Sequence, residues 1–338
     1  MEAEWNRRGT YVHFVKKEHL KLDDLRKTKG LNNKYLIKYD EIPEYPRPEI
    51  HVSHLKHDTD RQGLNGIKYS GGFKDPFGKG LVWWGLVVGG EELRSAEQRL
   101  LQETEQQVQV QQSFLGEFAS SPAFKKSSRL GSYRFTFPLQ ELLEAYSLQF
   151  CGGEQPLMRV YETHLYKQEV MYAVLVHSPA NQEQFSKYPL LSDDPNAVCC
   201  YRDGRFIWRP EAMCETHSYE LFRNDETQQM EARPYEPNWK APYYVWDNVG
   251  IALHVKDKLL EFDPVRLREK LKFCTGEILK TQVQFGVRLL HSKVQFDEFP
   301  LAEEIVRSLW PEDPSPLERD EDPSPLERDE EQDINKAE

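Results

Sequence analysis

One uninterrupted apolar segment, Leu81–Val88, does most to constrain how this chain can fold. It contains the adjacent residues Trp83 and Trp84, in a sequence of which 38% is hydrophobic and 30% is charged. A short apolar run without polar alternation is typical of a β-strand that is buried on both faces. Any fold of this chain must therefore cover both sides of at least one strand, and the chain as a whole is not disordered.

Strand and helix patterns alternate around this segment. The segment 58–69 predicts a short helix that Asp58, Thr59 or Asp60 can cap and that a glycine pair ends. Helical spacing of apolar residues also predicts helices over 91–112 and after Pro138. The remaining periodic segments are expected to be strands, at 50–55, 133–137, 158–160 and 169–177. This mixture favours an α+β fold.

The chain divides into four parts on composition. Residues 1–48 form a polar N-terminal arm, and the first domain is expected over 50–178. A Pro-, Asn-, Asp- and Ser-rich stretch at 178–197 indicates a boundary. The second domain, 195–310, is expected to be β-rich, with a hairpin turn at Asp203-Gly204 and a strand within 243–255. Two helices, near 264–279 and 301–309, should close it.

The last part, residues 311–338, is strongly acidic. It holds 12 acidic and three basic residues, so it carries −9 of the formal net charge of −12. The segment 313–321 is repeated as 322–330, residue for residue. Two polar copies are too few for a solenoid, so we expect a disordered acidic tail that offers a site for a protein partner. The nearly neutral remainder argues against a dedicated nucleic-acid binder.

Two clusters contain residue types that can bind metal ions. His51, His54 and His57 would share one side of a helix, but the segment has the pattern of a strand, which would point His54 away from the other two. Adjacent cysteines on a strand face opposite sides, so only one of the pair could bind a metal. The spacing of the second cluster matches no zinc ribbon. No metal is expected at either cluster; the second one comprises Cys199, Cys200, Cys214 and His217.

Sequence signals for the cellular location are few. No apolar run is long enough to span a membrane, and the N-terminus lacks the apolar core of a signal peptide. Five cysteines is a low and odd number, which favours reduced thiols. We therefore expect a protein of the cytoplasm or nucleus, without a membrane partner.

Three short segments carry a resemblance to a known family. Leu55-Lys-His57-Asp-Thr59 leads into a short helix with Gly66-Ile67 and a glycine turn. Phe77-Gly78-Lys79-Gly80-Leu81 and Leu165-Tyr166-Lys167-Gln168-Glu169-Val170 follow in order. Over residues 50–177 the chain resembles the ADP-ribosyltransferase superfamily, of the PARP-like type. The resemblance implies a split, mostly antiparallel sheet with helices, followed here by the β-rich module.

The resemblance also implies a site for NAD as substrate. Glu169 would be the catalytic carboxylate that stabilises an oxocarbenium-like ribose, and His57 would bind a ribose hydroxyl. The remaining cofactor contacts would come from Thr59, Gly78, Gly80, Trp83 and Trp84. Asp58 stands where the family has Gly, and Val82 stands where a Tyr stacks on nicotinamide.

Two functions follow as expectations. The first is transfer of ADP-ribose from NAD to a protein or nucleic-acid acceptor, a glycosyltransferase reaction. The second is a non-enzymatic interaction module with an inactive fold of this type. This module would bind a partner through its aromatic β-rich domain and acidic tail.

Overall fold

The computed structural model of the protein describes residues 1–5, 11–21, 24, 47–75, 78–103, 121, 123–166, 169–213, 219–223, 230–234, 245–276 and 294–320. Within them the fold is mixed α/β, with one large, mostly antiparallel sheet and few helices. Among the described residues, no helix has both the length and the apolar character needed to cross a membrane.

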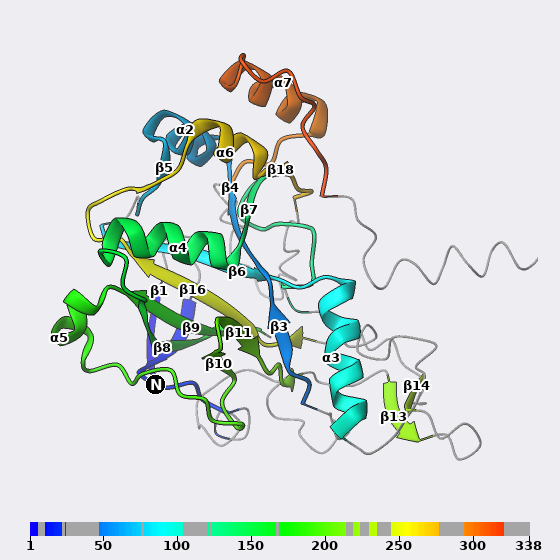
Figure 1. The fold of residues 1–338 in the computed structure, drawn as a ribbon. Helices are drawn as coiled ribbons and strands as arrows, with labels where there is room; N and C mark the ends of the chain where they lie inside the picture. Colours follow the sequence, from blue (N-terminus) through cyan, green and yellow to red (C-terminus); the bar gives the residue numbers. More distant parts are fainter. Residues whose placement is uncertain are drawn as a thin grey trace, which may run out of the picture.

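A nine-stranded sheet forms the centre of the molecule. Its neighbouring strands are antiparallel except for one parallel pair, β9 with β16. Figure 1 shows helix α4 lying across one face of this sheet. From one edge to the other the strands are β1 (Glu2–Trp5), β2 (Tyr11–Lys16), β8 (Leu157–Tyr166), β9 (Glu169–His177), β16 (Asn248–His254), β6 (Leu81–Val87), β4 (His54–Thr59), β7 (Tyr133–Pro138) and β18 (Leu271–Phe273).

Smaller sheets extend this framework. Strand β3 continues almost directly into β4 and pairs with the β10–β11 hairpin, whose turn residues Asp203 and Gly204 both have positive φ, as the sequence predicted. The strands are β3 (Ile50–Val52), β10 (Cys199–Arg202) and β11 (Arg205–Trp208), then the pairs β12 (Ala212–Met213) with β15 (Val245–Trp246), β13 (Tyr219–Arg223) with β14 (Met230–Pro234), and β5 (Gly72–Phe73) with β17 (Leu260–Glu261).

Helices α2 and α6 begin at capping aspartates. Asp60 accepts a hydrogen bond from the Gly63 N–H at the start of α2, and Gly71 ends that helix in the left-handed conformation. Asp263 caps α6 through the Val265 N–H. The helices are α2 (Arg61–Ser70), α3 (Gly90–Glu103), α4 (Leu139–Phe150), the 3₁₀ turn η4 (Pro179–Asn181), α5 (Gln182–Phe185), α6 (Pro264–Glu269) and α7 (Phe299–Leu309).

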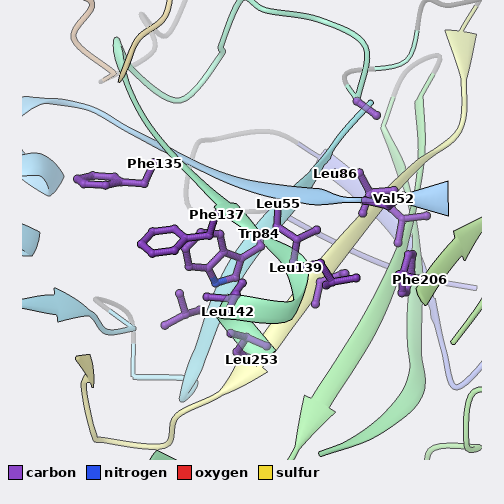
Figure 2. Close-up of a cluster of buried hydrophobic side chains, with 14 of the residues drawn as sticks. Val52, Leu55, Trp84, Leu86, Phe135, Phe137, Leu139, Leu142, Phe206 and Leu253 are labelled. Carbon is purple, nitrogen blue, oxygen red and sulfur yellow. The ribbon is translucent and has the colours of Figure 1, made fainter. Parts of the chain in front are cut away.

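The main core lies between the sheet and α4. Trp84 is 1% exposed and packs edge-on against Phe137, and Leu142 of α4 is fully buried. Figure 2 shows these side chains meeting Leu55 and Leu253 from neighbouring strands. Each fully buried aromatic or leucine side chain contributes about 1.5–3 kcal/mol of transfer free energy, so this face holds the fold together.

The central sheet takes strands from both of the expected domains. β16 comes from the expected second domain, yet it lies between β6 and β9, which belong to the first. Its apolar residues Val249, Ile251, Ala252 and Leu253 are all buried. A strand with apolar side chains on both faces is stable in the interior of a sheet, where both faces are covered. The stretch 178–197 is therefore a connection within one sheet framework.

The expected helix over 264–279 is wrong. Helix α6 ends at Glu269, and Leu271–Phe273 forms β18, which pairs with β7 at the edge of the sheet. Leu271 and Phe273 are buried and Lys272 between them is not, which is the two-residue period of a strand. The tertiary pairing with β7 overrides the helical pattern that precedes it.

The described part of the N-terminal arm contains two strands: β2 pairs with β8, and β1 pairs with β2 at the edge of the sheet. The expectation for the C-terminal tail is corrected in part. Residues 311–320, which were assigned to a disordered tail, pack against β18, and Leu317 is 3% exposed. The rest of the tail, from residue 321, lies outside the described residues.

Candidate functional site

A pocket lies between the central sheet and the segment that contains α5, and we call it the α5 pocket. Its volume is about 130 Å³ and it opens to solvent. The sheet supplies its floor, because alternate residues of β6, β9 and β16 face away from the main core. The lining residues are Lys79, Leu81, Tyr161, Leu175, Gln184, Phe185, Lys187, Tyr188 and His254.

The segment over the pocket is tied to the sheet at both ends. Ser178 accepts a hydrogen bond from the Ala180 N–H and so starts the η4 turn. Further along, the Val160 N–H donates to the Pro189 carbonyl, and the Leu191 N–H donates to the Met158 carbonyl. These backbone bonds hold the side chains of α5 over the floor, so the pocket is pre-formed.

A buried arginine lies behind the pocket wall. Arg159 is 5% exposed, and its Nε donates to His177 Nε2 at 2.8 Å while Nη1 donates to the Tyr188 carbonyl at 2.6 Å. His177 Nδ1 lies 2.8 Å from the Ser178 carbonyl, so the ring carries its proton on Nδ1 and is neutral. Burial lowers the pKa of His177, which agrees with this neutral state.

Arg159 has no carboxylate partner within ion-pair distance among the described residues. A buried cation without an anion produces a positive potential that the low dielectric of the interior screens poorly. Arg159 therefore adds a positive potential on the side of Tyr188, whereas the charge of Glu162 acts on the side of Tyr161, where it adds to the effect of burial in raising the pKa of Tyr161.

His254 supplies a polar group to the floor of the pocket. Its Nδ1 lies 3.5 Å from the Asn181 amide nitrogen, and Phe185 packs edge-on against the ring at 4.7 Å. Burial, followed by the charge fields of His177 and Lys256, lowers the pKa of His254. With Nδ1 accepting from Asn181, the neutral ring carries its proton on Nε2, which can donate to a ligand.

Aromatic rings form the other walls. The rings of Tyr161 and Tyr188 lie 4.9 Å apart between centroids, and Trp83 lies 6.4 Å from Tyr161. Burial raises the pKa of Tyr161, so its hydroxyl stays protonated and can act as a donor. Lys79 and Lys187 are exposed at the pocket, and none of its described lining residues is a carboxylate. The arrangement suits a small, partly aromatic anion.

The predicted site residue His57 is half-buried against the main core. Its Nδ1 is 2.8 Å from the Trp83 carbonyl, and its ring packs against Phe73 and Trp84 at 5.1 and 5.4 Å. Burial lowers its pKa, and the hydrogen bond to the Trp83 carbonyl opposes this only in part. The ring therefore has a structural role, because its hydrogen bond to the Trp83 carbonyl joins β4 to β6.

The residues after His57 are also engaged locally. Asp58 receives two hydrogen bonds from Arg134, at 2.7 and 2.8 Å, and Arg134 is 2% exposed. Burial would raise the pKa of Asp58, but the charge and hydrogen bonds of Arg134 lower it overall. Thr59 packs against α2, where a Cβ at Gly63 would overlap Thr59 Oγ1. Asp58 at this position therefore builds the fold through a buried ion pair.

Gly78 and Gly80 form the turn that leads into β6. Both have φ of +73°, and a Cβ at Gly80 would lie 2.9 Å from Lys256 Cα. The Gly80 N–H donates to Asp75 Oδ2, and the Gly80 carbonyl accepts from the Val255 N–H. Close contact between two backbone segments requires glycine here. Phe77 lies outside the described residues.

The two tryptophans face opposite sides of β6. Trp84 is buried against α4, whereas Trp83 is partly exposed and packs against the small apolar cluster under the α5 pocket. Of the predicted cofactor residues, Trp83 packs against the cluster under the pocket. Gly78 and Gly80 are the sequence neighbours of Lys79, which lines the pocket. His57 and Trp84 lie towards the main core.

Glu169 is the first residue of β9, and its backbone pairs with Tyr166; its side chain lies outside the described part of the structure. β16 and β6 lie between β9 and the strand of His57. Three strand spacings of roughly 4.8 Å separate the two strands by about 14 Å. The roles of His57 and Glu169 at an NAD site stay predictions.

The candidate metal residues do not assemble among the described residues, where no group of three or more His, Cys, Asp or Glu could hold an ion. Cys199 and Cys200 are fully buried, and burial raises the pKa of both thiols, which disfavours the thiolate that zinc requires. Cys214 and His217 lie outside the described residues.

No family model matches this chain, and comparisons with curated proteins and with solved structures gave no match either. The α5 pocket was missed from the sequence, because its residues come from four strands, from α5 with the turn after it, and from the turn before β6. The one available signal was the string Gly78-Lys79-Gly80-Leu81, which contributes Lys79 and Leu81. Arg159, Tyr161 and His254 lie in ordinary strand patterns.

Proposed function

We propose that the protein binds a small organic anion in the α5 pocket, with a ring or other flat apolar part against Tyr161, Phe185 and Tyr188. The observation that carries this proposal is the charge of the pocket. Lys79 and Lys187 line it, Arg159 lies behind it without a carboxylate partner in the described chain, and no described lining residue is acidic. In a chain of net charge −12, such a locally positive pocket favours an anion.

The size of the pocket limits the ligand. An apolar cavity of about 150 Å³ holds one benzene ring. At about 130 Å³ the α5 pocket accepts one ring or one anionic group, with any larger remainder outside the opening. The hydroxyl of Tyr161 and the Nε2–H of His254 would orient the bound group, since both remain neutral donors.

Thermal-shift and calorimetric titrations with phenyl phosphate test this proposal. Phenyl phosphate at millimolar concentration should raise the Tm, whereas phenol, which lacks the charge, should not. Replacing both Lys79 and Lys187 by Gln should weaken binding at least tenfold. Arg205→Gln removes an exposed cation from the β10–β11 hairpin and should leave binding unchanged. Equal binding of phenol, or an equal loss in Arg205→Gln, would contradict the proposal.

A second candidate is transfer of ADP-ribose from NAD to a protein or nucleic-acid acceptor. One observation favours it: β4, which contains the first family-like segment, is a neighbour of β6, which begins at the last residue of the second. Lys79 and Leu81 of the second segment line the α5 pocket. The residues that would carry it are Glu169 and His57.

Release of nicotinamide from NAD, with mass spectrometry of candidate acceptors, tests this second function. Glu169→Gln should abolish release, and Glu154→Gln, at an exposed position after α4, should not. Phenyl phosphate binding without nicotinamide release would leave the first proposal standing and exclude the second.

A further inference from the structure

The first copy of the repeated segment, Asp313–Asp320, lies along the edge of the sheet in a groove. We define the repeat groove by the residues that contact this copy. Three are cations and two are aromatic rings, which suits an acidic segment with one apolar side chain. They are Arg134, Arg268, Lys272, Phe273 and Phe299.

Backbone contacts fix the register of the docked segment. The Phe273 N–H donates to the Glu318 carbonyl at 2.8 Å, and the Asp320 N–H donates to the Phe273 carbonyl at 3.0 Å. Arg268 Nη2 donates to the carbonyls of Ser315 and Pro316, at 2.6 and 3.3 Å. The segment thus forms one isolated parallel bridge, Phe273 with Arg319, at the edge of β18.

Side chains then fix which sequence can dock. Leu317 is 3% exposed and belongs to the main core. Asp320 forms an ion pair with Arg134 at 2.6 Å, and Glu318 forms one with Lys272 at 3.2 Å. The Arg319 guanidinium lies 3.8 Å from the centroid of the Phe299 ring.

Each of these contacting residues recurs nine positions later. Leu326 corresponds to Leu317, and Asp329 corresponds to Asp320. The prolines that set the extended backbone recur as well, and Glu321 precedes the second copy as Glu312 precedes the first. Since the groove recognises only residues that both copies possess, it cannot distinguish the copies by their contacts.

We propose that the repeat groove is a docking site for either copy, and that Asp322–Asp329 of the same chain exchanges with Asp313–Asp320 in it. The second state lengthens the connection from Trp310 by nine residues, which would loop out. Loop-closure entropy rises only slowly with length, so the second state should be disfavoured by roughly tenfold. Since one leucine site is available, docking of one copy releases the other as an accessible acidic, proline-containing segment.

Substitution of the two leucines in the full chain tests the exchange. Leu326→Asp should leave the Tm unchanged, and Leu317→Asp should lower it by less than about 3 °C, because the second copy replaces the first. The double variant should lose at least twice as much. If Leu317→Asp alone lowers the Tm as far as the double variant does, the exchange is overturned.

Disulfide formation gives an independent test that does not depend on stability. Lys272→Cys with Glu318→Cys should cross-link the first copy, and Lys272→Cys with Glu327→Cys should cross-link the second, at a lower yield. Adding Leu317→Asp should raise the second yield severalfold. Asn335→Cys, beyond the repeat, is the matched control. A Glu327→Cys yield no higher than that of Asn335→Cys, or cross-links only between two chains, would overturn the exchange within one chain.

Discussion

Two buried arginines on the same sheet have opposite surroundings. Arg134 on β7 contacts two carboxylates, Asp58 and Asp320, whereas Arg159 on β8 contacts a neutral imidazole and a backbone carbonyl. Both are nearly inaccessible, at 2% and 5% exposure. The difference lies in the charge of the partners and not in the depth of burial.

The charge of Arg134 therefore has a structural role, whereas the charge of Arg159 can stabilise a bound ligand. Burial alone would lower the pKa of Arg134, but the charge and hydrogen bonds of Asp58 raise it, so that pair is electrically complete. Around Arg159 the positive charge is solvated by dipoles and is not neutralised. An anion in the α5 pocket would complete it, which is why we place the ligand there.

The largest effect is expected from Arg134→Met. The substitution leaves the Asp58 carboxylate buried without its partner, and breaking a buried pair costs about 3–5 kcal/mol. Arg159→Met should cost only about 1–2 kcal/mol, because it leaves neutral acceptors behind. Chemical denaturation measures both. Adding Asp58→Leu to Arg134→Met should restore part of the loss; equal losses in the two single variants would remove the distinction.

A pH-dependent effect of intermediate size is expected from Lys56, which lies on the Arg134 side. Burial, and then the charge of Arg134, lowers its pKa to about 7 from a usual 10.5. The unfolded chain therefore holds this proton over the window from pH 7 to 10.5, and stability rises with pH there. Between pH 7 and 8.5 the protein should gain about 2 kcal/mol relative to Lys56→Met.

Denaturant titrations at several pH values measure this difference. The window ends at pH 8.5 because the buried thiols act oppositely above it: burial raises the pKa of Cys199 and Cys274. Their contribution is lost as the pH rises past the usual thiol pKa. A constant difference between the two proteins from pH 7 to 8.5 would show that Lys56 keeps an ordinary pKa.

The smallest effect is expected from His177 on the Arg159 side. Its pKa is lowered by burial, so the unfolded chain takes up the proton first as the pH falls below 6.5. The contribution of the neutral ring is present above pH 6.5 and is lost below it. From pH 7 to 5 the protein should lose stability relative to His177→Gln, which has no titratable ring.

Binding of benzenesulfonate should fall over the same acidic range only if the pocket wall opens, because this anion keeps one negative charge from pH 7 to pH 5. Calorimetric titration of benzenesulfonate at pH 7 and pH 5 in both proteins separates the two effects. An identical pH dependence of stability in the two proteins would contradict the neutral tautomer that links His177 to Arg159.

Local signals predicted several elements well. The apolar run at Leu81 is a central strand, and the Asp60 cap and Gly71 terminate α2 as expected. The Asp203-Gly204 hairpin is also confirmed. In each case the decisive interaction lies within a few residues along the chain, so sequence neighbours suffice to identify it.

The site depended on contacts far apart in sequence. The sequence showed that His57 follows a strand, but burial under Phe73 gave the ring a role in the core. Lys79 lies in the second of the three family-like segments. The residues that line the pocket with it, Tyr161, Lys187 and His254, come from other strands and turns. Since strand order is not encoded locally, no pattern within one segment could group these residues.

The sequence by itself determined that the chain has a doubly buried strand, capped helices, an acidic end and a duplicated segment. Only the tertiary structure decided that β16 lies between β6 and β9, that Leu271–Phe273 is a strand, and that Asp313–Asp320 docks on it. The physical reason is that periodicity and caps are local, whereas burial depends on which distant surface covers a residue. Leu317 is buried in the main core because its segment is held to the sheet edge by the backbone of Phe273 and by the ion pair of Asp320 with Arg134.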